Sequence, residues 1–213
     1  MLETLKNAWQ MADLRKKLLY TGMILLLFRI GAAIPVPFLE PETLKTYITE
    51  GGNWLGYIDL LSGGAFGNST LFALGISPYI TASIVIQLLA VAIPSLEQLA
   101  KEGEEGRKVL NRYTRYATVI LGGVQSVAYY FLLRNSNALL YTEGASGIFS
   151  AVVIVISFLA GAMLVMWMGE QIDNKGIGNG ISMILFAGIV SRASSLVSTM
   201  VTEIYLAING IMK

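Results

Sequence analysis

The chain has 213 residues, 54% of them hydrophobic and 14% charged, and its mean hydropathy is +0.63. Soluble domains average about 25% charged residues, so this composition indicates a membrane protein. Cysteine and histidine are both absent, which excludes disulfides, thiolate catalysis and histidine-based metal or proton-transfer sites. A net charge of +1 gives no bulk attraction for nucleic acid. We therefore expect no enzyme, no cofactor, no metal and no direct binding of nucleic acid.

Five apolar stretches are candidate membrane-spanning helices, because about 20 apolar residues cross a hydrocarbon core. They cover residues 18–34, 71–93, 116–133, 148–168 and 177–191. Arg29 and Arg192 are expected near the outer ends of the first and last helices, with side chains extended to the interface. Because Arg15, Lys16 and Lys17 precede the first stretch, a signal peptide is the alternative there. We favour a span, since Arg29 interrupts the run and no small-residue cleavage site follows.

Residues 57–70, between the first two stretches, are expected to form an outer segment rather than a span. A short helix at 58–61 is predicted to lead into a flexible pair, Gly63 and Gly64, where glycine relaxes the limits on the backbone. Asn68, Ser69 and Thr70 match the glycosylation pattern, which we interpret as coincidental.

The second stretch carries a polar face and therefore meets something other than lipid. Its polar or helix-breaking residues are Ser77, Pro78, Thr81, Ser83 and Gln87. Ile76 and Ile80 are four residues apart and share one helix face, a spacing that usually indicates packing alone. An amide such as that of Gln87 is costly in lipid unless it has a partner. One interpretation is a hydrogen bond to a neighbouring helix, worth about 1 kcal/mol.

The distribution of basic residues predicts how the chain is oriented. Ten of the 15 Lys and Arg residues fall in the amino-terminal tail, in the segment between stretches two and three, or between stretches four and five. The positive-inside rule then places the amino terminus in the cytoplasm and the carboxy terminus outside. The segment 97–115 mixes basic and acidic residues and is expected to be a solvated cytoplasmic loop.

The last part of the chain contains a glycine-rich turn and an amphipathic segment. The glycines of 176–180 resemble a dinucleotide-binding loop only superficially, because no strand precedes them; we expect a tight turn that caps the fifth span. Residues 194–212 are predicted to form an amphipathic helix, either the outer end of span five or a surface helix. Its apolar residues recur at helical spacing: Leu196, Met200, Ile204, Ile208 and Ile211.

Four long motifs, in this order, resemble the SecY translocon family. They are FRIGAAIPVP (28–37), LSGGAFGNSTLFALGISPYITASIVIQLL (61–89), KEGEEGRKVLNRYTRY (101–116) and MWMGEQIDNKGIGNGISMILFAGIV (166–190). Together they extend over nearly the whole chain. The resemblance implies an all-α membrane fold of two inverted five-span halves. This chain is similar to the amino-terminal half, residues 1–213, with five spans and a re-entrant plug.

The same resemblance implies roles for particular residues. Ile76, Ile80 and Leu185 match members of a hydrophobic pore ring. The plug matches Tyr57, Ile58, Asp59, Leu60, Leu61, Ser62, Gly63, Gly64, Ala65 and Phe66. A lateral gate toward lipid is matched by Thr81, Ile84, Gln87 and Gln125. For Gln87, this role is the alternative to the interhelical hydrogen bond described above. Lys101, Arg107, Lys108 and Arg112 match a cytoplasmic loop that meets partners.

The implied function is passive conduction of unfolded secretory chains, with sideways release of apolar segments into the lipid bilayer of the inner (plasma) membrane. The implied partners are SecE-like and SecG-like subunits, a SecA motor or the ribosome, client chains, and a carboxy-terminal half or second copy that completes the pore. A half-channel acting as a groove-type insertase or scaffold is one alternative. A small-solute transporter is another, although such proteins normally carry ionisable residues inside their spans.

Overall fold

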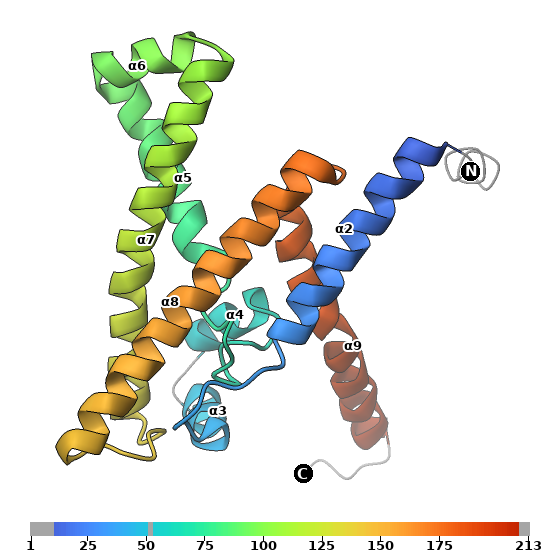
Figure 1. The fold of residues 1–213 in the computed structure, drawn as a ribbon. Helices are drawn as coiled ribbons and strands as arrows, with labels where there is room; N and C mark the ends of the chain where they lie inside the picture. Colours follow the sequence, from blue (N-terminus) through green and yellow to red (C-terminus); the bar gives the residue numbers. More distant parts are fainter. Residues whose placement is uncertain (1–10, 51–52, 209–213) are drawn as a thin grey trace.

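The computed structural model describes residues 11–50 and 53–208, and its regular structure is helical (Figure 1). The helices are α2 (Ala12–Gly31), α3 (Pro41–Glu50), α4 (Asn53–Leu61), α5 (Ser77–Ala92), α6 (Pro94–Lys101), α7 (Glu104–Asn135), α8 (Gly144–Lys175) and α9 (Gly180–Ile208). Within the described ranges, extended pairing is limited to two isolated bridges, Pro35–Thr70 and Leu39–Leu139. The all-α prediction is therefore confirmed.

The long helices pack side by side in chain order, with α2 completing the arrangement. Helix α5 lies along α7, α7 packs on α8, and α8 contacts both α9 and α2. The start of α2, helix α6 and the α8–α9 turn lie at one end of the molecule (Figure 1, top). Helix α3 and the carboxy-terminal ends of α7 and α9 lie at the other end. The basic residues at the start of α2, on α6, at the start of α7 and in the α8–α9 turn thus lie at the first of these ends. The orientation in a membrane stays a prediction.

The expected second span, residues 71–93, is helical only from Ser77. Residues 71–76 form turns instead, because Gly75 adopts a left-handed φ of 56° that a continuing helix cannot contain. Pro78 then occupies the first turn of α5, where its missing N–H is not needed. The Leu71 N–H donates to the carbonyl of Ile34 at 2.9 Å, which ties this segment to the end of α2.

The segment 97–115 was expected to be a loop, and this prediction was wrong. Most of it is helical, because α6 ends at Lys101 and α7 begins at Glu104. Gly103 supplies the turn with a φ of 74°, and the acidic residues in the first turn of α7 favour helix initiation there. Helix α6 is bent by 103° from α5, so the two do not form one straight rod.

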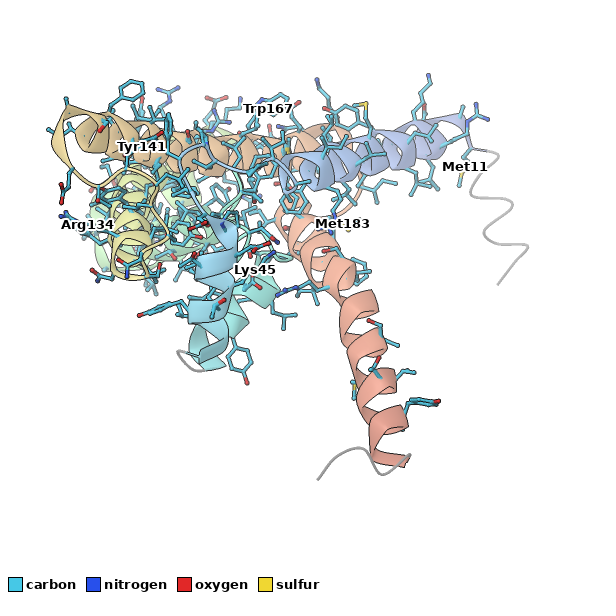
Figure 2. All side chains as sticks on the ribbon, turned by 90° about the horizontal axis from the view of Figure 1, so that it is seen from below. Met11, Lys45, Arg134, Tyr141, Trp167 and Met183 are labelled. Carbon is cyan, nitrogen blue, oxygen red and sulfur yellow. The ribbon has the colours of Figure 1, made fainter. Side chains whose placement is uncertain are left out.

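Helix α9 continues without a break to Ile208, so of the two alternatives for 194–212 the structure has the outer end of the fifth helix. The expected amphipathic helix at 194–212 is therefore the second half of α9, and its residues 209–212 lie outside the described part of the chain. Exposed apolar side chains line this half at Val197, Met200, Val201, Ile204 and Tyr205. Figure 2 shows it projecting away from the other helices.

By length and composition, two of the described helices, α7 and α8, could cross a membrane. Helices α5 and α6 would make a third if the bent pair is one span. The apolar part of α9 is shorter, Gly180–Arg192, and α2 carries several charged residues. The division into five spans stays a prediction.

Two buried clusters hold the helices together, and the segment after α4 bridges them. One cluster combines α2, α8 and α9 around Phe72 and Ile76, and includes Ala65. The other combines α7 and α8 around Phe158, and includes Phe66. Because Ala65 and Phe66 are adjacent, the end of the predicted plug is fixed between both clusters.

Candidate functional site

A groove of about 430 Å³ runs between α4, α5, α7 and α9. Its lining includes all three predicted ring residues, Ile76, Ile80 and Leu185. Ile76 is 3% exposed, while Ile80 and Leu185 are half-buried. Although Ile76 precedes α5, its carbonyl accepts a hydrogen bond from the Ile80 N–H at 3.1 Å, so the two side chains stay one turn apart. Leu185 reaches the same groove from α9.

The predicted plug supplies another wall of this groove. Ile58, Leu61, Ser62 and Phe66 line it, whereas Tyr57 is exposed and does not. The Ser62 hydroxyl donates to the carbonyl of Asp59 and accepts from the Phe66 N–H. The Tyr129 hydroxyl, from α7, donates to the carbonyl of Phe66. The plug segment is thus folded on itself and tied to α7.

The Gly63–Gly64 pair was expected to be flexible, but it is tightly packed. Both residues adopt left-handed φ angles, 67° and 87°, which glycine allows without strain. A Cβ placed on Gly63 would lie 2.9 Å from the carbonyl oxygen of Gly188. The glycines therefore permit close approach of the plug backbone to α9.

Charged contacts around the plug were missed at the sequence level. Arg192 of α9 forms an ion pair with Oδ2 of Asp59, and Arg29 of α2 donates to the carbonyl of Gly63 and to the hydroxyl of Ser191. Both arginines thus contact the plug, a partner that the sequence did not indicate, and their position at the membrane interface stays a prediction. The sequence held one signal, because Asp59 is the only charged residue between Glu50 and Glu97.

The four predicted gate residues divide into two pairs. Thr81 and Gln125 line the groove, whereas Ile84 and Gln87 are exposed outside it. The Gln87 amide donates to the hydroxyl of Ser83 at 3.0 Å. Because Ser83 lies on the same helix, the interpretation that Gln87 bonds to a neighbouring helix was wrong, and its assignment to the gate stays a prediction.

The predicted partner residues lie at the far end of the molecule from the groove, on α6 and α7 (Figure 1). Lys101 pairs with Glu97 at 2.5 Å and Lys108 with Glu105 at 2.8 Å. Both pairs are exposed, as are Arg107 and Arg112. Exposed pairs of this kind contribute little to stability, so these charges are available at the surface.

The turn between α8 and α9 caps α9 as expected. The Gly180 N–H donates to Oδ1 of Asp173 at 2.6 Å, and the Ser182 N–H donates to Oδ1 of Asn179 at 3.0 Å. The Ile177 N–H donates to the hydroxyl of Thr21, which fastens the turn to α2. In the part of the chain that the structure describes, no cluster of acidic side chains could hold a metal ion.

A family model and curated relatives all match this chain to the same family. The family model described as SecY matches residues 70–212. The protein translocase subunit SecY of Thermotoga maritima is 41% identical over 203 residues, which cover 92% of this chain and 47% of that protein. The Thermus thermophilus protein of the same name is 42% identical over 193 residues, covering 89% and 44%. The chain thus spans about half the length of the curated relatives it matches.

Solved structures agree on the fold. The Sec61 channel of the canine ribosome-channel complex from the endoplasmic reticulum superimposes with a TM-score of 0.56 at 24% identity, over 84% of this chain and 36% of that chain. A second structure, described as a protein-conducting channel, gives the same values. Because the family model covers most of the chain and the architecture agrees, this chain belongs to the SecY family.

Proposed function

We propose that the chain forms the amino-terminal half of a protein-conducting channel for unfolded secretory chains and emerging membrane segments. One observation carries the proposal: a single groove is lined by all three ring residues, by four plug residues and by two gate residues. These residues come from four helices, α4, α5, α7 and α9, and from the segment between α4 and α5. Relatives that align with 92% and 89% of this chain, at 41% and 42% identity, are named protein translocase subunits.

The groove suits passive conduction. A collar of Ile76, Ile80 and Leu185 blocks ions by excluding water, yet apolar side chains can yield around a passing chain. The plug closes the groove when no client is present. Apolar client segments leave sideways past Thr81 and Gln125, driven by transfer of apolar surface out of water. The energy for movement comes from a partner motor or from translation.

The remaining partners complete this proposal. A carboxy-terminal half or a second copy supplies the other side of the ring, and SecE-like and SecG-like subunits surround it. A SecA motor or the ribosome meets the charged surface of α6 and α7. The amino terminus lies in the cytoplasm and the carboxy terminus outside, because the basic residues gather at the end of the molecule that carries α6.

A crosslinking experiment tests the ring, and it uses the absence of native cysteine. An Ile80→Cys variant is expected to crosslink to a stalled secretory chain that carries a thiol-reactive probe, in membranes that also contain the carboxy-terminal half. Val91→Cys is the matched control, because Val91 lies on the same helix, 80% exposed and outside the groove. Equal crosslinking at both positions, or none at Ile80 with the chain correctly inserted, would contradict the ring assignment.

A second candidate function is a groove-type insertase, favoured because this chain alone forms a continuous groove wall. Crosslinking of Ile80→Cys without the carboxy-terminal half would support it. Crosslinking only with that half present would support the shared pore.

The gate assignment of Gln87 makes a separate prediction. Gln87→Leu is expected to change how hydrophobic a client signal must be, because it replaces an exposed amide on the gate face with an apolar group. The loss of its bond to Ser83 should change stability by less than about 1 kcal/mol. Export of a graded series of signal sequences measures the effect. If only the yield of the protein changes, Gln87 is not part of a gate.

A further inference from the structure

The plug segment is fastened to two neighbouring helices by polar groups that the conduction model does not use. Asp59 lies on α4, Arg29 on α2, and Ser191 and Arg192 on α9. These residues are 34 to 162 positions from their partners in the sequence, so the contacts are tertiary. They meet where the plug backbone passes α9 at Gly63.

Asp59 is the centre of this cluster. It is 6% exposed, and both carboxylate oxygens are used: Oδ1 accepts from the Gly67 N–H at 2.6 Å and Oδ2 pairs with Arg192. The bond to Gly67 is made to the residue directly after the plug, so it fixes the shape of the segment. The pair with Arg192 is made to another helix, so it fixes the position of the segment.

Arg29 makes a second attachment beside the first. It donates to the carbonyl of Gly63 at 3.3 Å and to the hydroxyl of Ser191 at 3.1 Å. The Ser191 hydroxyl in turn donates to the carbonyl of Gly188 at 2.7 Å, and Gly188 is the residue against which Gly63 packs. Plug, α2 and α9 are therefore joined at one point.

We propose that Asp59 and Arg192, supported by Arg29, form a latch that holds the plug against α9, and that conduction requires its release. The claim that conduction requires release rests on the proposed function. The contacts that form the latch are present in this structure whatever the function is. The side chain of Asp59 is 9% exposed and that of Arg192 is 36% exposed. Removing Arg192 leaves a buried carboxylate without its counter-charge, which favours the state in which that charge reaches water. Removing the charge of Asp59 removes the attraction that holds the plug to Arg192. Loss of either charge should therefore favour displacement of the plug.

Cysteine reactivity measures plug displacement directly, because any introduced cysteine is the only one in the chain. Ala65 is 1% exposed, so an Ala65→Cys reporter in membranes is expected to react slowly with a membrane-impermeant maleimide. Asp59→Asn and Arg192→Gln should each raise that rate about tenfold. If both act through one contact, the double variant should react no faster than either single variant.

Matched controls keep the outcome specific. Glu143→Gln and Arg134→Gln remove exposed charges that take no part in the latch and should leave the rate unchanged. Ser69→Cys, a nearly isosteric reporter at a fully buried position, checks that Ala65→Cys has not itself displaced the plug. An unchanged rate in Asp59→Asn, additive effects of the two variants, or rapid labelling of both parent reporters would overturn the latch.

Translocation of a secretory chain, followed in the same membranes, separates the two proposals. Raised labelling without any translocation would keep the latch and refute the proposed function. Translocation that proceeds while labelling is insensitive to Asp59 and Arg192 would keep the function and refute the latch.

Discussion

Replacing Gly161 by alanine is expected to destabilise the chain by about 3 kcal/mol, the upper end of what overpacking a core usually costs. Gly161 lies on α8, and a Cβ there would lie 1.8 Å from the carbonyl oxygen of Leu71. The obstacle is backbone rather than a flexible side chain, so α8 and the segment before α5 must separate. That segment carries Ile76, and its displacement would also disturb the ring wall of the groove.

Gly123→Ala on α7 is the matched control, because a Cβ there meets nothing within 4 Å. It should be neutral or stabilise the protein by about 0.5–1 kcal/mol, since alanine loses less conformational freedom than glycine on entering a helix. Thermal unfolding of both variants in detergent measures the difference. Equal stability of the two would show that α8 does not approach Leu71 as closely as described.

Replacing Phe72 by alanine is expected to cost on the order of 3 kcal/mol, because it empties a large buried site. Phe72 is 1% exposed, and its ring stacks on Phe28 with centroids 5.7 Å apart. Its edge also fills the space over Gly31, where a Cβ would come within 2.1 Å of the ring. No neighbouring backbone can close the cavity without moving α2.

Phe186→Ala provides the comparison, since Phe186 is 64% exposed on α9. Its loss should change stability by less than about 0.5 kcal/mol, the usual range for surface substitutions. Protease resistance and thermal unfolding in detergent report both variants. A cost for Phe72→Ala no larger than that for Phe186→Ala would remove Phe72 from the centre of the cluster that joins α2, α8 and α9.

The sequence predicted helices well where apolar residues are continuous and poorly where backbone geometry decides. The run at 148–168 lies wholly inside α8. The run at 71–93 looked equally continuous, but hydropathy carries no information on the left-handed φ of Gly75. The start of α7 was missed because its residues are charged rather than apolar. Charged residues suggested a loop, although charge is compatible with an exposed helix.

For the candidate site, local spacing was sufficient for some residues and insufficient for others. Ile76 and Ile80 share a face because they are four residues apart, and the structure places both in the groove. The contacts of Asp59 and Arg29 depend on partners more than 30 positions away. Without an account of which helices are neighbours, a lone charge in an apolar segment shows that a partner must exist but not which one.

The separation between Asp59 and Arg192 also sets an order of assembly during synthesis. The two residues are 133 positions apart, and ribosomes add about 5–20 residues per second. Arg192 therefore follows Asp59 out of the ribosome by roughly 7 to 27 s, a long time compared with the folding of a single helix. Helices α4, α5 and α7 are all made before that interval ends. A newly made chain thus passes through a period in which three walls of the groove exist and nothing yet fastens the plug to α9.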